Sequence, residues 1–152
     1  MYEIFRINKN ETPLKKFAED LLYHVLWAPY GISQNKTGEI FEKNQQNNPF
    51  YIAIKSSHPE VLGCIVTNEI GFNFKIKHLA VKNQFQGKGI GSSLVKHVLN
   101  KTHGKKVEVI ARNTSTDFWE KLGFIACGKW IKHPLFIDHG IIFRKYCYNP
   151  NI

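Results

Sequence analysis

The sequence has few cysteines and no pattern typical of a metal site. Its three cysteines form no Cys-x-x-Cys pair, so they indicate neither a disulfide framework nor a zinc site. Cys64 and Cys127 lie within apolar runs, where a cysteine is usually a small buried hydrophobic residue. The seven histidines include no His-x-His or His-Glu-x-x-His arrangement. We therefore expect no metal and no disulfide framework.

Long apolar runs are also missing. No stretch approaches the roughly 20 residues of a membrane span, and the first ten residues, MYEIFRINKN, lack the apolar core of a signal peptide. We expect a cytoplasmic protein without membrane contact. A length of 152 residues with 43% hydrophobic residues favours a single domain over residues 1–152. A monomer and a homodimer are both left open.

Acidic residues are scarce. The chain has 12 Asp and Glu residues against 21 Lys and Arg residues, which gives a net charge of +9. Such an excess favours an anionic partner, namely a phosphorylated cofactor, an acidic substrate or nucleic acid. The lysines are dispersed, in pairs such as Lys15-Lys16, and no basic stripe with interleaved aromatic residues is present. We therefore expect no dedicated nucleic-acid site.

Short apolar or alternating runs predict most of the strands. They lie at residues 2–7, 50–55, 61–67, 72–81, 107–111, 124–126 and 135–143. Neighbouring early strands imply antiparallel pairs, and two strand-helix-strand crossings in the middle of the chain imply parallel pairs. An α/β (α+β) fold is therefore expected, with a central mixed β-sheet flanked by helices.

Helical spacing predicts four helices. The first covers residues 13–25, with an apolar stripe of Leu14, Phe17, Leu21 and Val25, and the segment 27–31 ends it. Two more helices are predicted at 37–43 and 90–102, and the second of them has an apolar stripe of Ile90, Leu94, Val95, Val98 and Leu99. A fourth helix is expected to be capped by Asn113 or Thr114 and to end at Gly123.

The most informative segment runs from Leu79 to Leu94, LAVKNQFQGKGIGSSL. A strand enters a glycine-rich turn, and the turn opens a helix. Gly87, Gly89 and Gly91 allow a tight bend and a close approach of a ligand to the backbone. The free N–H groups of the first helical turn and the helix dipole favour negative charge there. This pattern predicts a phosphate or pyrophosphate site, with Lys88 as an added cation.

Two other phosphate-binding motifs do not fit this segment. A P-loop requires Ser or Thr directly after the Gly-Lys pair, and here Gly89 follows Lys88. A dinucleotide fingerprint that starts at Gly87 requires a glycine at position 92, which is Ser92. The acidic residue expected further along is present as Glu108, but it lies inside a predicted strand.

Two segments of the sequence resemble motifs of the GNAT superfamily of N-acetyltransferases, and they occur in the same order as in the family. Leu79-Ala80-Val81 followed by Gln86-Gly87-Lys88-Gly89-Ile90-Gly91 is similar to the acetyl-CoA motif Q/R-x-x-G-x-G/A. The stretch at 113–124, NTSTDFWEKLGF, is similar to the family's N-x-x-A-x-x-F-Y-x-K-x-G-F. Both motifs together are more specific than either alone, and the predicted element order fits the family.

The resemblance implies an acetyl-CoA-dependent enzyme. The strand backbone would bind the pantetheine arm, the Val81 N–H would polarise the thioester carbonyl, and the turn would enclose the pyrophosphate. The cofactor-binding residues expected on this basis are Leu79, Ala80, Val81, Gln86, Gly87, Lys88, Gly89, Ile90, Gly91, Ser92, Asn113, Phe118 and Lys121.

Two catalytic positions of the family carry other residues here. Trp119 occupies the position of the tyrosine general acid, and an indole N–H is not a useful proton source. Lys75 stands where many members carry a glutamate base, and Lys77 lies on the same strand face. His139 is the candidate proton shuttle, because histidine as a residue type is suited to proton transfer near neutral pH. On a strand, Asp138 would point away from it.

Three further residues carry weaker expectations. His78 is expected to face away from Lys75 and Lys77 and to pack against a helix. Tyr146 and Cys147 are further catalytic candidates in the C-terminal segment.

Three functions remain open. The leading hypothesis is an acyltransferase that moves an acetyl group from acetyl-CoA to a primary amine of a small molecule or peptide, by the direct attack that the resemblance implies. Because Trp119 and Lys75 replace the usual acid and base, a second possibility is a module that binds acetyl-CoA and has little or no catalytic activity. The positive charge leaves open an acetyltransferase for an aminoacyl-tRNA or another nucleic-acid-bound amine.

Overall fold

The computed structural model describes residues 2–7, 12–35, 49–55, 60–70 and 73–150. The chain forms two compact units. The first comprises Met1–Thr67 and His78–Val98, and the second comprises Asn68–Lys77 and Leu99–Ile152.

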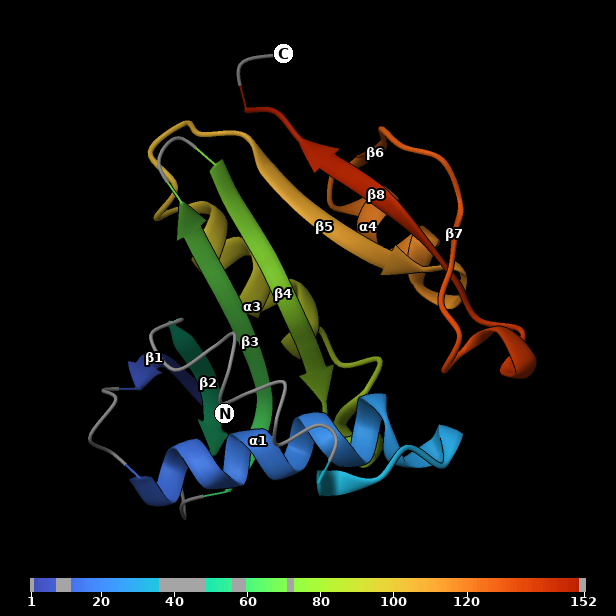
Figure 1. The fold of residues 1–152 in the computed structure, drawn as a ribbon. Coiled ribbons are helices and arrows are strands. Elements are labelled where there is room, and N and C mark those ends of the chain that lie inside the picture. Colours follow the sequence, from blue (N-terminus) through green and yellow to red (C-terminus); the bar gives the residue numbers. More distant parts are fainter. Residues whose placement is uncertain (1, 8–11, 36–48, 56–59, 71–72, 151–152) are drawn as a thin grey trace. The chain divides into compact units, whose positions relative to one another are not determined.

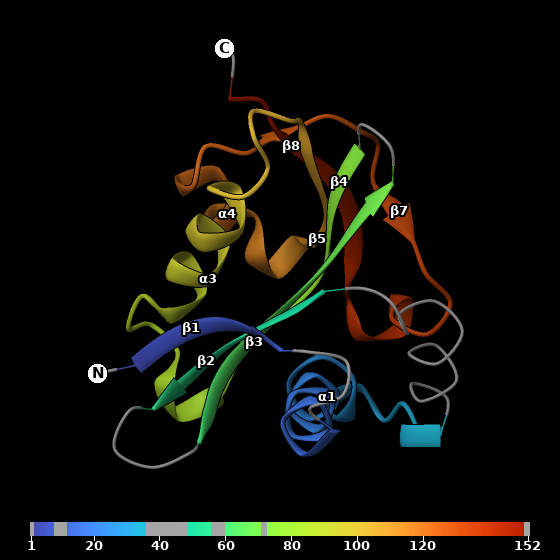
Figure 2. The ribbon, with the colours of Figure 1, turned by 90° about the vertical axis from the view of Figure 1, so that its left-hand side faces the viewer.

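The first unit is built on antiparallel strands. These are β1 (Tyr2–Ile7), β2 (Phe50–Lys55) and β3 (Val61–Ile70), whose last three residues belong to the second unit. In the pairing of β1 with β2, Tyr2 lies opposite Lys55. Helix α1 (Thr12–Leu26) lies on one face of these strands and α3 (Ile90–Leu99) on the other (Figure 2). The strands predicted at 2–7 and 50–55 are confirmed, and β3 continues three residues beyond its predicted end at 67.

Helix α1 buries a different stripe from the predicted one. Ala18 and Leu22 are fully buried, whereas Phe17 is 59% exposed. Residues four positions apart share one helix face, so the buried stripe is shifted by one residue and the prediction for Phe17 was wrong. A 3-10 turn at Ala28–Tyr30 follows the helix, which confirms the end predicted there.

Helix α3 packs closely on β3. Four of the five residues of its predicted apolar stripe, Ile90, Leu94, Val95 and Val98, are buried, and Leu99 at its end is half-buried. Gly63 of β3 lies beneath the helix, and a Cβ at this position would stand 3.0 Å from Leu94 Cδ1 and 3.2 Å from Ile90 Cγ2. A residue without a side chain permits this close approach, which places the start of α3 firmly against the strand.

The second unit contains the parallel pair of the sheet. Strand β4 (Asn73–Val81) starts here and ends in the first unit, and its segment 74–76 pairs in parallel with 107–109 of β5 (Val107–Arg112). Strand β8 (Ile142–Tyr148) is antiparallel to β5, to β6 (Ile125–Ala126) and to β7 (Ile131–Lys132). The strand order β1-β2-β3-β4-β5-β8-β6 gives the predicted mixed sheet (Figure 1).

Two predictions for the C-terminal strands were wrong. Strands β5 and β6 run in the same direction but do not pair, because β8 lies between them. The segment 135–143 is not one strand: a 3-10 turn covers Ile137–His139, and Gly140 has a φ of 74°. This left-handed residue turns the chain immediately before β8 begins at Ile142.

The start of helix α4 (Thr116–Lys121) also differs from the prediction. Its N-cap is Ser115, without a side-chain cap bond, so Asn113 and Thr114 are not its caps. The Asn113 amide instead donates to the Gly140 C=O at 3.1 Å and accepts from the Ile142 N–H at 3.2 Å. Its side chain therefore extends the pairing of β5 with β8 beyond the last strand pair.

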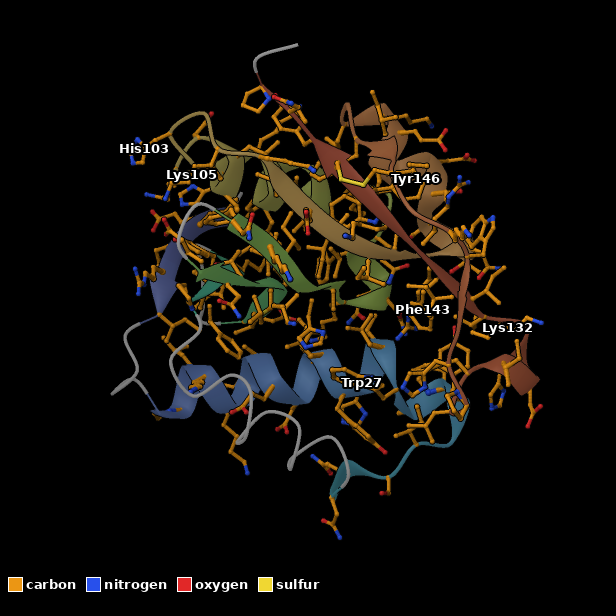
Figure 3. All side chains as sticks on the ribbon, turned by 45° about the horizontal axis from the view of Figure 1, so that its top comes forward. Trp27, His103, Lys105, Lys132, Phe143 and Tyr146 are labelled. Atoms are coloured by element: carbon orange, nitrogen blue, oxygen red, sulfur yellow. A yellow bond between two sulfur atoms is a disulfide. The ribbon has the colours of Figure 1, made fainter. Side chains whose placement is uncertain are left out.

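Cys127 and Cys147 form a disulfide, with their Cα atoms 6.1 Å apart (Figure 3). This corrects both the expectation of no disulfide framework and that of a buried Cys127, which is exposed. The pairing of β6 with β8 brings the two cysteines together, and the Cys127 N–H donates to the Lys145 C=O. Cys64 is fully buried as predicted, and burial raises the pKa of its thiol.

The described residues contain neither a membrane-spanning helix nor a cluster of metal ligands. None of their helices is long and apolar enough to cross a membrane. Their His, Cys, Asp and Glu side chains form no group of three or more that could hold a metal ion. The helix predicted at 37–43 lies outside the described residues.

Candidate functional site

The candidate site of the first unit begins where β4 ends. The Lys82 N–H donates to the Leu62 C=O of β3 at 2.8 Å, and the Lys82 ammonium lies 2.7 Å from the Glu60 carboxylate. Successive residues of a strand present their N–H and C=O groups to opposite edges. Val81 therefore presents its backbone polar groups to the edge that faces away from β3.

The turn that follows β4 is held by backbone and side-chain hydrogen bonds. A 3-10 turn covers Asn83–Phe85, and the Phe85 N–H donates to the Lys82 C=O at 2.8 Å. The Gln86 side-chain NH2 donates to the Val81 C=O at 2.9 Å and to Asn83 Oδ1 at 3.2 Å. The conformation of the turn between β4 and α3 is thus stabilised by hydrogen bonds within residues 81–86.

Two glycines of this turn have left-handed backbone conformations. Gly87 has a φ of 77° and Gly89 a φ of 85°, which favour glycine over residues with a Cβ. A Cβ at either position would meet no atom within 4 Å. The backbone conformation, and not crowding within the protein, therefore requires these glycines, and the space beside them is open to a ligand.

The first turn of α3 supplies hydrogen-bond donors. An α-helix leaves its first N–H groups without intrahelical acceptors, and the helix dipole adds partial positive charge at this end. The first bond back to the turn runs from the Ser93 N–H to the Gly89 C=O at 3.0 Å. The Ser93 hydroxyl accepts a bond from the Tyr2 hydroxyl at 2.8 Å, which ties α3 to β1. The N–H groups before it belong to Ile90, Gly91 and Ser92.

Lys88 adds a positive charge to the turn. Its side chain is exposed, and its ammonium lies 5.5 Å from the centre of the Phe85 ring. None of the described acidic side chains forms an ion pair with it, whereas Lys82 is paired with Glu60. Open glycines, helix N–H groups and a lysine together can hold a phosphate or pyrophosphate group.

The remaining cofactor residues predicted from the second motif lie in the second unit. Asn113 uses both ends of its amide on the backbone at 140–142. Phe118 is half-buried, and Lys121 is exposed at the end of α4. No local sequence signal pointed to the contact of Asn113, because its partners lie 27 and 29 residues away.

Trp119, at the position where the family's tyrosine was expected, belongs to the core of the second unit. The residue is 4% exposed, and its ring makes edge-to-face contacts with Phe118 at 5.0 Å and Phe124 at 5.1 Å. Among the described residues, no side chain or carbonyl accepts a hydrogen bond from its indole N–H. The ring fills a hydrophobic position, and an indole N–H is not a useful proton source.

The other catalytic candidates are exposed. Lys75 lies on β4 in register with Glu108 of β5. Asp138 and His139 are exposed in the 3-10 turn before β8, so the strand geometry assumed for this pair does not apply. His78 contacts Trp27, the residue after α1, edge-to-face at 5.2 Å (Trp27 is labelled in Figure 3), as expected for packing against a helix end.

A polar contact that no sequence pattern indicated joins β8 to α4. The ring of Tyr146 is buried, and its hydroxyl donates to Glu120 Oε1 at 3.2 Å. Burial first, and the Glu120 carboxylate second, raise the pKa of Tyr146. This phenol is therefore a weaker acid than an ordinary tyrosine, and its position indicates a structural role.

Comparison with protein families gives a match over most of the chain. The family described as acetyltransferase (GNAT) domain matches residues 30–146, which include both motif segments and the whole of the strand-turn-helix site. A sequence search of curated proteins found no match.

Solved structures of similar fold cover nearly the whole chain. An IAA acetyltransferase from Bacillus cereus is 23% identical with a TM-score of 0.71, and covers 98% of this chain and 99% of its own. A GNAT family acetyltransferase from Elizabethkingia anophelis with acetyl-CoA bound is 24% identical with a TM-score of 0.72, and covers 97% of each chain. A Bacillus subtilis acetyltransferase in complex with CoA is 20% identical with a TM-score of 0.71, and covers 98% of this chain and 99% of its own.

Proposed function

Because the chain belongs to the GNAT acetyltransferase family, we propose that it moves an acetyl group from acetyl-CoA to a primary amine of a small-molecule or peptide acceptor. Membership places the protein among the acyltransferases. The solved structures of similar fold include one with acetyl-CoA and one with CoA, which supports the choice of cosubstrate.

The observation that carries this proposal is the strand-turn-helix of the first unit. Gly87 and Gly89 leave open space at the turn, and the first N–H groups of α3 are donors for phosphate oxygens. The residues proposed to bind the pyrophosphate and the pantetheine arm in this unit are Leu79, Ala80, Val81, Gly87, Lys88, Gly89, Ile90, Gly91 and Ser92. Gln86 supports them through the turn.

The backbone of β4 is suited to act on a carbonyl group. Acetyl-CoA, when bound, supplies an acetyl thioester as the acyl donor. The Val81 N–H, on the edge of β4 away from β3, is proposed to donate a hydrogen bond to the carbonyl oxygen. Donors aimed at an oxygen that gains negative charge typically contribute about 10²–10³-fold to the rate.

Proton transfer must accompany the attack. An alkylammonium has a pKa of about 10.4, so the acceptor amine loses a proton before its nitrogen bonds to the carbonyl carbon and the C–S bond breaks. The nitrogen gives up a second proton as the amide forms, and of the two protons one goes to the departing thiolate and the other to solvent. Because Trp119 has no suitable proton, we propose exposed His139 or water as the carrier, and Lys75 as the weaker candidate. His139→Ala would lower kcat at least about tenfold if the imidazole carries the proton, and little if water does.

One alternative function has an observation in its favour. The buried indole of Trp119, in place of an acid, would also suit a module that binds acetyl-CoA and catalyses slowly or not at all. Binding without turnover would support this alternative, so the two measurements must be made together.

The test combines ligand binding with a screen for acceptors. Acetyl-CoA should raise the melting temperature, because a ligand that binds the native state stabilises it. Release of free CoA thiol is then measured with amines, polyamines, amino acids and peptides, and the acetylated product is identified by mass spectrometry. Binding with turnover of at least one amine supports the proposal. Absence of any thermal shift would contradict it.

A further inference from the structure

The side chain of Gln86 is turned back onto the strand that precedes it. Its NH2 group donates to the Val81 C=O at 2.9 Å and to Asn83 Oδ1 at 3.2 Å. Its backbone N–H donates to the Asn83 C=O at 3.3 Å. Because both side-chain partners are oxygen acceptors, the NH2 end of the amide must face them.

This arrangement leaves the Gln86 side chain unsuited to bind a phosphate directly. A glutamine amide has two N–H donors, and both are engaged with the protein. The other end of the amide, Oε1, is an acceptor and would repel an anionic oxygen. The side chain therefore acts on the shape of the strand end and not on the phosphate.

The end of β4 is held from both edges. On the β3 edge, the Lys82 N–H bonds to the Leu62 C=O at 2.8 Å, and the Lys82 side chain pairs with Glu60. On the opposite edge, the Gln86 amide occupies the Val81 C=O. The N–H and C=O of one strand residue point to the same edge, so holding the Val81 carbonyl also fixes the direction of the Val81 N–H.

We infer that Gln86 is a positioning residue that aims the Val81 N–H at the thioester carbonyl of bound acetyl-CoA. The inference rests on the proposed function, and it adds a residue that acts only through Val81. Small errors of alignment are costly, because a displacement of about 1 Å can lower a rate about 10²-fold. Loss of the amide should therefore lower kcat while leaving the affinity for acetyl-CoA nearly unchanged.

Two variants in the same turn test this. Gln86→Met keeps the length of the side chain and removes both donors. Gln84→Met is the matched control, because it makes the same chemical change two residues earlier. Gln84 is exposed in the same turn, and its side chain forms no hydrogen bond with the rest of the described chain. The melting temperatures of both variants establish that each is folded.

The decisive readout needs no acceptor. Acetyl-CoA labelled with carbon-13 at the thioester carbonyl gives an infrared band that moves to lower frequency when the oxygen accepts a hydrogen bond. We expect this shift in the wild type and in Gln84→Met, and a smaller shift in Gln86→Met. The dissociation constant of Gln86→Met should stay within about threefold of the wild-type value, and its kcat with any working amine should fall about 10- to 100-fold.

Three results would overturn the inference. A dissociation constant at least tenfold weaker with kcat retained would make Gln86 a ligand for the cofactor. A carbonyl band in Gln86→Met at the same frequency as in the wild type would show that the Gln86 amide does not determine the direction of the Val81 N–H. If acetyl-CoA fails to raise the melting temperature of the wild type itself, the proposed function fails along with the inference, and the first two results cannot then arise.

Discussion

Two replacements of Gly89, by glutamine and by glutamate, distinguish the effect of its backbone conformation on stability from the effect of charge on acetyl-CoA binding. Gly89 has a φ of 85°, and a Cβ there meets no atom within 4 Å. The Cβ of Gly89→Gln therefore has room within the protein, and the expected cost is that of the left-handed backbone conformation, about 1–2 kcal/mol. A domain with a typical stability of about 5–15 kcal/mol remains folded after such a loss, with a melting temperature lower by several degrees.

Gly89→Glu has nearly the same shape as Gly89→Gln and differs in charge. If the turn encloses the pyrophosphate, the new carboxylate lies near phosphate oxygens. Two like charges about 6 Å apart, at an effective dielectric constant near 20, repel by about 3 kcal/mol. That energy corresponds to an acetyl-CoA dissociation constant about 100-fold weaker for Glu than for Gln.

The assay is calorimetric titration of acetyl-CoA into the two variants, with melting temperatures measured in parallel. The wild type should bind acetyl-CoA most tightly, Gly89→Gln less tightly and Gly89→Glu least tightly. Added salt should narrow the gap between Gln and Glu, because it screens exposed charges. Equal affinities for the Gln and Glu variants at low salt would refute the placement of the pyrophosphate at this turn.

Three further outcomes are expected. Thiol titration of the unfolded chain should find one thiol without reductant and three with it, and three thiols without reductant would exclude the bridge. Replacing Cys127 and Cys147 by serine should lower the free energy of unfolding by about 3 kcal/mol, because the bridge joins residues 20 positions apart. The raised pKa of Tyr146 means that the stability it confers is complete below its unfolded pKa of about 10 and is lost as the pH rises toward the folded value. The wild type should therefore lose more stability than Tyr146→Phe in urea unfolding above that pH, and parallel losses would contradict the assignment. Gly63→Ala should destabilise by about 1–3 kcal/mol in the same assay, because its Cβ would press on Leu94; an unchanged midpoint would show that α3 can move away.

Local sequence pattern was sufficient where an element buries one face regularly. Along β4, exposed and buried residues alternate from Asn73 to Lys77, as strand geometry requires, and the strand predicted at 72–81 covers the whole of β4. The stripe of α3 was predicted for the same reason, since its buried residues recur at helical spacing. Helix α1 was harder, because Phe17 and Ala18 are both apolar and only packing decides which of them faces the sheet.

The pattern failed where partners distant in the chain determine the local structure. Cys127 follows an apolar run and looks like a core residue, yet it is exposed and bonded to Cys147 because β6 pairs with β8. Asn113 looks like a helix cap, but its amide bonds to the backbone of Gly140 and Ile142. Pairing between segments so far apart in the chain has no signature in the local sequence of either.

The two halves of the proposed chemistry differ in the same way. Phosphate recognition at 81–93 depends on backbone features, namely left-handed glycines, helix N–H groups and a strand end, which a short contiguous segment can specify. Acid–base catalysis depends on the pKa of a side chain, and that pKa is determined by burial and by neighbours. Tyr146 illustrates the point, because its pKa is raised by its burial and by Glu120, a residue 26 positions away. The sequence alone therefore shows that a tryptophan stands at the position of the usual proton donor. Which other group carries the proton cannot be predicted from the sequence, because its pKa depends on contacts that only the folded chain creates.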